Sequence, residues 1–181
     1  VDTAIHLVDT VLSFLGPPVE AQTAKVPTTH AGCFLAQSAG EEGEPGLSGL
    51  RGRSEAVGPL FATLEWLDAL LSRQRYLCGA QQTEADWRLY PNLVRFDSIF
   101  YIGYKCNLRR IEDYPNLSNY LRDLYQQPGI AETVNFDHIK RHYYITHDDI
   151  NPTRIVPLGP ILDLERPHGR SAWPSARSAD G

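Results

Sequence analysis

The sequence predicts an all-helical bundle, and three observations carry that prediction. Apolar residues after residue 59 recur at the spacing of one helical face, a capping box opens a second periodic run, and no strand pattern matches these helical patterns in strength. We expect a flexible, low-complexity segment over residues 1–58, a helical domain over residues 59–170 and a loose tail over residues 171–181. One ordinary domain fits a chain of 181 residues.

The N-terminal segment offers little to build a core. Residues 1–15 could form a short amphipathic helix, which Pro17 and Pro18 would end because proline lacks the amide proton and clashes with the preceding turn. From Glu20 to about Gly58 the chain is rich in Gly, Ser, Pro, Ala and Glu and has no apolar periodicity. Such a stretch cannot bury enough apolar surface to offset the conformational entropy that the chain loses when it becomes ordered. We expect a flexible linker, with a segment that folds on a partner as the alternative.

Three helices are expected to begin at Pro59, Thr83 and Pro115. In the second, the Asp86 carboxylate can reach back to the Thr83 amide, while the Thr83 hydroxyl accepts from an amide three residues on. Pro91 should kink this helix without ending it, and proline is favoured at the first position of the third. The residues expected on buried faces are Leu60, Leu64, Leu67, Leu71, Leu89, Leu93, Phe96, Phe100, Leu117, Tyr120, Leu121 and Leu124.

A fourth helix is expected over residues 130–144, after the Pro128-Gly129 break. The following stretch, NPTRIVPLGPILDLERPHG, has prolines spaced too closely for a helix or a central strand. It should cross the surface as extended coil. The element order therefore predicts a bundle with a long extended tail.

Composition excludes some classes of function. A net charge of −5 and a pI near 5.6 argue against binding to a nucleic acid backbone, which requires a strongly basic face. The apolar run at residues 4–15 is too short to span a membrane and has no basic residues before it. Cys33, Cys78 and Cys106 are odd in number and widely spaced, which suits reduced thiols in the cytoplasm.

A metal site is not expected. His138 and His142 stand four residues apart on one helical face, and His147, Asp148 or Asp149 could add a ligand. The glutamate of the metalloprotease pattern is absent, and the neighbouring cations at positions 140 and 141 oppose a bound metal. Hydrogen bonding and capping are the simpler roles for these histidines. We expect no metal.

Two sequence blocks, occurring in this order, form a pattern specific to one class of proteins: TEADWRLYPNLVRFD at residues 83–97 and FDHIKRHYY at residues 136–144. Together with NPTRIVPLGP they resemble the helical C-terminal domain of the glutathionyl-hydroquinone reductases, the Xi class of glutathione transferases, over about Leu60 to Gly169. The resemblance implies a glutathione-transferase C-terminal bundle, glutathione as co-substrate, glutathionyl-hydroquinone-type substrates and a homodimer. In that family a cysteine of a thioredoxin-like domain takes the glutathione sulfur as a mixed disulfide, and a second glutathione releases it.

These 181 residues contain no Cys-Pro-Trp-Ala motif and no thioredoxin-like part. We therefore expect the chain to be catalytically silent alone. Two alternatives remain open: a non-enzymatic interaction module that keeps the bundle as a docking surface, and an incomplete gene product whose reading frame begins earlier.

The resemblance implies a catalytic role for Tyr143. The family's tyrosine at this position points its hydroxyl at the nucleophilic sulfur, and a hydrogen bond to a thiolate lowers the pKa of the thiol. A second family tyrosine aligns with Phe100, which lacks a hydroxyl, and the adjacent Tyr101 points about 100° further round a helix. Phe100, Tyr101 and Tyr144 are the substrate-binding candidates. The plain alternative is that these aromatic residues pack the bundle.

Overall fold

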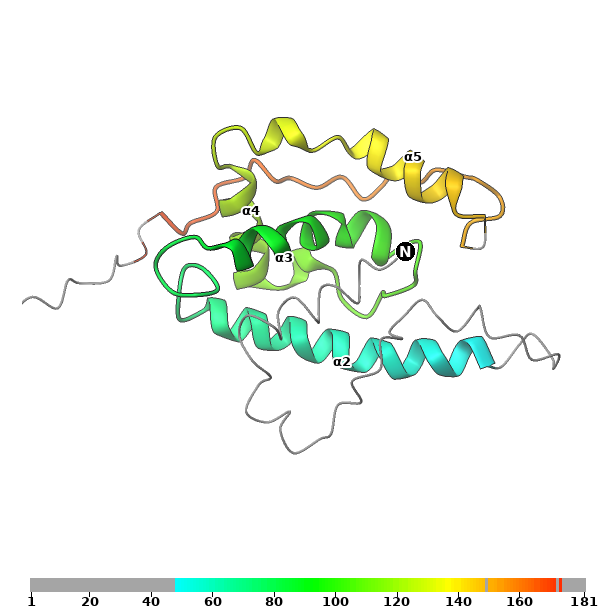
Figure 1. Ribbon diagram of the computed structural model, residues 1–181, viewed down its shortest axis with the longest axis horizontal. Coiled ribbons are helices and arrows are strands. Elements are labelled where there is room, and N and C mark those ends of the chain that lie inside the picture. The colour runs from blue at the N-terminus through cyan, green and yellow to red at the C-terminus, as the bar shows by residue number, and fades with distance from the viewer. Residues whose placement is uncertain (1–47, 149, 172, 174–181) are drawn as a thin grey trace, which may run out of the picture. The chain divides into compact units, whose positions relative to one another are not determined.

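The computed structural model describes residues 48–148, 150–171 and 173 (Figure 1). The chain divides into two compact units, Val1–Leu67 and Asp68–Gly181. The helix expected at residues 1–15, Cys33 and nearly all of the tail after residue 171 lie outside the described residues. Throughout the described ranges the regular structure is helical, and an isolated bridge between Tyr76 and Gly79 is the only strand-like pairing there. None of the described helices is long and apolar enough to cross a membrane.

Helix α2, Ser48–Leu71, begins before the expected start at Pro59, which lies inside it. The predicted start is therefore wrong. Apolar periodicity indicates where a helix is buried, but a formed helix can extend beyond that face because each added residue gains a hydrogen bond. The buried face itself is confirmed, since Leu64, Leu67 and Leu71 are fully buried and Leu60 is 4% exposed.

Helix α3, Glu84–Arg95, begins with the expected capping box. The Asp86 carboxylate accepts from the Thr83 amide at 2.7 Å and from the Thr83 hydroxyl at 3.0 Å. It also accepts from the Leu77 amide at 2.9 Å and from the Tyr120 hydroxyl at 2.8 Å. Asp86 is fully buried. One carboxylate thus joins α3, the loop before it and α4.

The helical path continues past Pro91 and changes into a π turn, η3, at Phe96–Phe100. The Tyr101 amide donates to the Phe96 carbonyl at 2.9 Å, which is the i to i+5 bond of a π turn. Asp97, buried in this turn, accepts from the amides of Ile111 and Glu112 at 2.6 and 3.2 Å. Burial raises the pKa of Asp97 to about 6, although these two hydrogen bonds oppose the shift. Asp97 thereby caps the short 3-10 helix η4, Ile111–Asp113.

Helix α4, Pro115–Tyr125, begins at the expected proline. The Asp68 carboxylate accepts from the amides of Asn116 and Leu117, both at 2.8 Å. A carboxylate at a helix N-terminus satisfies amides that have no partner within the helix and interacts favourably with the helix dipole. The end of α2 is therefore tied to the start of α4.

The helix expected over residues 130–144 is wrong in its boundaries. A 3-10 turn, η5, covers Ala131–Thr133, and helix α5 covers Phe136–Thr146. Val134 and Asn135 between them are extended, and the Asn135 side chain accepts from the His138 amide at 3.0 Å. Asparagine is a preferred N-cap residue. The cap at Asn135 thus sets the start of α5.

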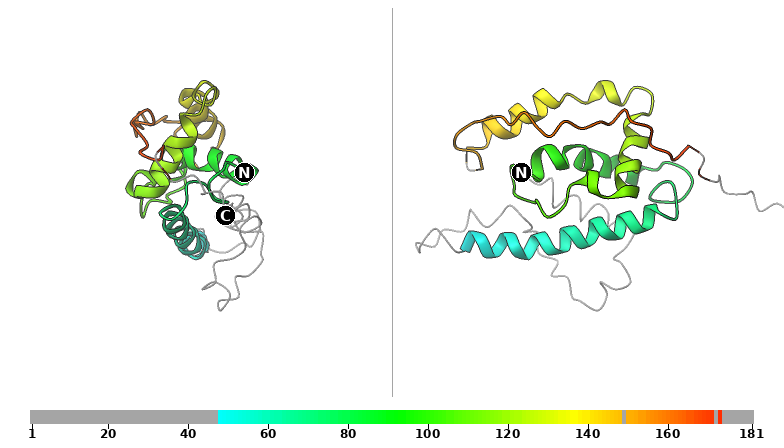
Figure 2. Two further views of the ribbon diagram at one scale, coloured as in Figure 1. Left: turned by 90° about the vertical axis from the view of Figure 1, so that its left-hand side faces the viewer. Right: turned by 180° about the vertical axis from the view of Figure 1, so that it is seen from behind.

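The tail beyond α5 is extended, as expected, and runs back beside α5 (Figures 1 and 2). Several polar side chains hold its backbone. The Lys140 ammonium donates to the carbonyls of residues 157, 158 and 159 at 2.7–3.3 Å, and burial lowers its pKa. Gln126 donates to the carbonyls of Leu164 and Arg166, both at 2.8 Å. The tail is therefore fastened along its length.

Candidate functional site

Tyr143 lies within a group of aromatic side chains that we call the ring cluster: Phe100, Tyr104, His142, Tyr143 and His147. The Tyr143 ring centroid lies 6.3 Å from that of Phe100 and 6.2 Å from that of Tyr104, both nearly edge-on. It lies 5.2 Å from the His142 ring, at 75°, and 5.6 Å from the His147 ring, which is stacked on it at 29°. These separations are those of interacting aromatic pairs.

Two stretches of the chain, residues 100–104 and residues 142–147, bring the ring cluster together. Tyr143 and His142 lie on α5, His147 follows α5, Phe100 ends the π turn and Tyr104 lies in the bend after it. The Cys106 amide donates to the Phe100 carbonyl at 3.0 Å and so closes that bend. Phe100 is 1% exposed, whereas Tyr143 is half-buried. Tyr143 is thus held by its ring while the residue keeps part of its surface in solvent.

Tyr144 points elsewhere and is buried. Its hydroxyl donates to the Ser98 carbonyl at 2.7 Å, and burial raises its pKa to about 12. Gly103 gives it room: a Cβ there would stand 2.9 Å from the Ile99 carbonyl oxygen and 3.4 Å from the Tyr144 ring. The hydroxyl of Tyr144 is therefore engaged in packing α5 against η3, and the expected substrate contact stays a prediction.

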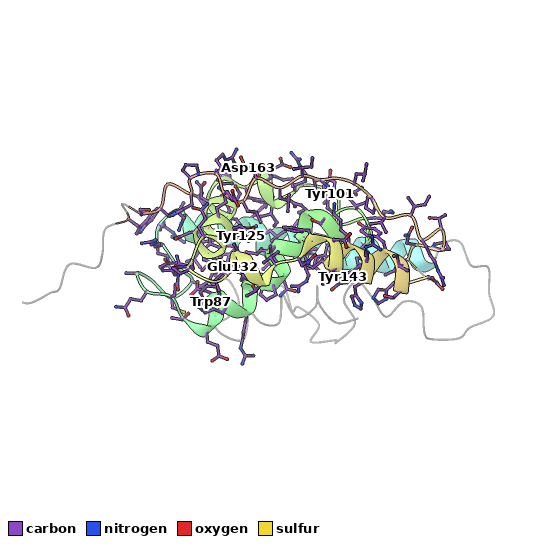
Figure 3. All side chains as sticks on the ribbon, turned by 90° about the horizontal axis from the view of Figure 1, so that it is seen from above. Trp87, Tyr101, Tyr125, Glu132, Tyr143 and Asp163 are labelled. Atoms are coloured by element: carbon purple, nitrogen blue, oxygen red, sulfur yellow. The ribbon has the colours of Figure 1, made fainter. Side chains whose placement is uncertain are left out.

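The other two substrate-binding candidates, Phe100 and Tyr101, are adjacent in sequence, but their side chains leave the helical backbone in different directions. Phe100 joins the ring cluster, while Tyr101 is half-buried and takes no part in it. Figure 3 shows Tyr101 apart from Tyr143. The structure thus brings Tyr143 and Phe100 together, and it leaves Tyr101 to a different part of the surface.

Sequence reasoning misses three members of the ring cluster, His142, His147 and Tyr104. It considers the two histidines only as metal ligands or capping groups, although His147 stands four residues after Tyr143, at the spacing of helical neighbours. Tyr104 gives no local signal, because its approach to Tyr143 depends on the π turn and the bend after it. Among the described residues, no three His, Cys, Asp or Glu side chains are grouped to hold a metal ion.

The arrangement provides a phenol at the edge of a packed aromatic group. A phenol is a neutral hydrogen-bond donor at pH 7 and can stabilise an anion without carrying charge. Its ring has neighbours on several sides, so the direction of the oxygen is restricted. Such a group is suited to binding an anionic or polar atom brought to the surface of α5.

Comparison with known proteins identifies the domain. Residues 51–123 match the family described as glutathione S-transferase, C-terminal domain. The chain carries a glutathione S-transferase C-terminal domain. The sequence resemblance is confirmed as well, because this C-terminal domain is 55% identical over 116 residues to glutathionyl-hydroquinone reductase YqjG of Escherichia coli, across 64% of this chain and 35% of that protein.

Two further relatives agree. Glutathionyl-hydroquinone reductase PcpF of Sphingobium chlorophenolicum is 53% identical over 110 residues, which are 61% of this chain and 35% of PcpF. A structure of a Xi class transferase from Natrialba magadii matches with a TM-score of 0.69 at 40% identity, over 94% of this chain and 46% of that one. A structure of YqjG with glutathione bound matches with a TM-score of 0.67 at 52% identity, over 68% of this chain and 40% of that one. The chain spans about a third of the length of the curated relatives.

Proposed function

We propose that this chain supplies the helical half of a glutathione-dependent reductase of glutathionyl-hydroquinones. The observation that carries the proposal is Tyr143, which lies half-buried in the ring cluster and belongs to FDHIKRHYY, one of the two blocks that resemble the reductases. The identity of 53–55% to two such reductases supports the same substrate class. Glutathione would be the co-substrate.

The proposed reaction joins two polypeptide segments. A thiolate of a thioredoxin-like domain, outside these 181 residues, attacks the sulfur of the glutathionyl-hydroquinone. The carbon–sulfur bond breaks, a mixed disulfide forms between the cysteine and glutathione, and the ring carbon takes up a proton to give free hydroquinone. A second glutathione thiolate then attacks the mixed disulfide, which releases oxidised glutathione and restores the cysteine thiolate.

In this reaction Tyr143 would donate a hydrogen bond to the cysteine sulfur while that sulfur is an anion. The bond favours the thiolate over the thiol and so raises the fraction of nucleophile at neutral pH. The half-buried ring of Tyr104 would form part of the apolar wall beside an aromatic substrate, and the buried Phe100 ring would support it from a centroid distance of 5.7 Å. A reaction that consumes reduced glutathione fits a cytoplasmic setting.

The proposal also includes a homodimer. Among the described residues, Ile155, Leu158 and Ile161 of the tail are large apolar side chains that are 69%, 95% and 96% exposed. They recur every third residue, which places them on one edge of an extended segment with three residues per turn. Because the backbone of this segment is fastened, the apolar edge offers a fixed contact surface for a second copy.

A domain exchange tests the function directly. Residues 59–181 of this chain would replace the matching part of the E. coli reductase, and reduction of a glutathionyl-hydroquinone would be followed by the release of free hydroquinone. We expect a rate within about tenfold of the parent enzyme, no rate from the 181-residue chain alone, and none after the nucleophilic cysteine of the donor half is changed to serine. A folded, glutathione-binding chimera without activity would contradict the proposal.

A further inference from the structure

His147 has the closest parallel contact with the Tyr143 ring. Their centroids are 5.6 Å apart and the planes differ by 29°, whereas every other ring pair in the ring cluster that includes Tyr143 is tilted by 71° or more. His142 meets both the Tyr143 ring and the His147 ring, at 5.2 and 5.4 Å. The phenol is therefore covered on a face by one imidazole and approached edge-on by another.

The backbone after α5 fixes where His147 lies. Helix α5 ends at Thr146, and His147 leaves it with φ −104° and ψ 78°. The His147 carbonyl accepts from the amides of Ile150 and Asn151, at 3.1 and 3.0 Å. The Asn151 side chain donates in turn to the carbonyls of Tyr144 and Ile155, at 2.7 and 3.1 Å. This turn holds His147 one helical turn beyond Tyr143, so the stacked contact is built into the chain path.

We propose that His147 is a positioning residue for Tyr143: the stacked imidazole fixes the plane of the phenol ring and hence the direction of its hydroxyl. The consequence for catalysis rests on the proposed function, in which that hydroxyl donates to a sulfur anion. A hydrogen bond weakens steeply as its angle departs from linear. The hydroxyl oxygen lies on the axis about which the ring turns, but the O–H bond prefers the plane of the ring. A ring that turned freely would therefore swing the proton away from the sulfur for part of the time, and stacking limits that motion.

The test uses the full 181-residue chain and nuclear magnetic resonance of labelled aromatic rings. The Tyr143 signals are assigned by their loss in Tyr143→Phe. Cross-relaxation between the ring protons of Tyr143 and those of Phe100 and Tyr104 then reports the ring plane. We expect His147→Ala to weaken these cross-peaks at least twofold, and His147→Phe, which keeps a flat ring, to restore them. The matched control is His138→Ala, because His138 is an exposed histidine on α5. This replacement should leave the Tyr143 cross-peaks unchanged.

The outcomes separate the possible roles. Unchanged cross-peaks in a folded His147→Ala chain would overturn the proposal, as would equal weakening in His147→Ala and His147→Phe. If His147→Ala fails to fold, His147→Leu fills the volume without a planar face, and its comparison with His147→Phe gives the same decision. The measurement needs no enzymatic activity. An inactive chimera would therefore sink the proposed function alone, while unchanged cross-peaks beside an active chimera would sink the role of His147 alone.

Discussion

Replacement of Asp86 with alanine is expected to destabilise the helical domain by about 4 kcal/mol, a loss in the range seen when a buried charged group that accepts several hydrogen bonds is removed. The two carboxylate oxygens accept from the amides of Leu77 and Thr83 and from the hydroxyls of Thr83 and Tyr120. Alanine would leave these donors without their acceptor in a site from which solvent is excluded. The free energy of unfolding is measured by urea denaturation followed by circular dichroism.

Two variants sharpen the result for Asp86. Glu84→Ala removes another carboxylate from the first turn of α3, but Glu84 is exposed and pairs with an exposed Arg88, so a loss of at most about 0.5 kcal/mol is expected. Tyr120→Phe removes a single donor and should cost about 1 kcal/mol. A loss below about 1 kcal/mol for Asp86→Ala would show that Asp86 does not join α3 to α4 as described.

Replacement of Arg170 with methionine is expected to cost about 3 kcal/mol, because hydrogen bonds to charged groups are individually worth about 1.5–3 kcal/mol. Arg170 is 2% exposed, and one terminal nitrogen of its guanidinium donates to the carbonyls of Leu71, Gln74 and Arg75 at 2.7–3.1 Å. Burial lowers the pKa of Arg170. Methionine keeps the apolar stem and removes the charge. The change should release the end of the tail from the end of α2.

Limited proteolysis and urea denaturation together check the role of Arg170. Chymotrypsin, which does not cleave at arginine, should cut the variant between residues 158 and 164 much faster than it cuts the unchanged chain, since the tail would open locally. Arg154→Ala is the control: Arg154 pairs with Asp148 on the surface, and both side chains are more than half exposed. Because solvent screens such a pair, its loss should leave the free energy of unfolding unchanged within the error of the measurement. Equal effects of the two replacements would refute a special role for Arg170.

Local signals predicted most of the helices. The buried leucines of α2, the capping box of α3 and the first proline of α4 each act within a few residues, so the sequence displays them. The expected boundaries of α5 are wrong because the predicted helix over residues 130–144 contains Asn135, which is a good N-cap and in fact starts α5. The π turn at Phe96–Phe100 could not be predicted, because an i to i+5 bond has no periodicity of its own and depends on packing against α5 and η4.

The catalytic role of Tyr143 stays a prediction. The resemblance singles out this tyrosine, and the structure places its ring in the ring cluster. Tyr144, its neighbour, carries the same chemical group, yet the helix turns its hydroxyl inward to the Ser98 carbonyl. Sequence alone cannot separate two adjacent tyrosines in this way, because the choice depends on which face of α5 meets η3. The stacking of His147 likewise depends on the turn that Asn151 closes.

The central claim is that the Tyr143 hydroxyl stabilises a sulfur anion by donating a hydrogen bond to it. The most direct test measures the pKa of the nucleophilic cysteine thiol in the chimera with the E. coli reductase. The rate of alkylation by iodoacetamide, followed from pH 4 to pH 10, gives the pKa of that thiol. Tyr143→Phe should raise this pKa by about one unit, which corresponds to the loss of a hydrogen bond worth about 1.4 kcal/mol to the thiolate. Tyr101→Phe, the same chemical change at a half-buried tyrosine outside the ring cluster, should leave it unchanged. An equal thiol pKa in the two variants and the unchanged chimera would contradict the claim.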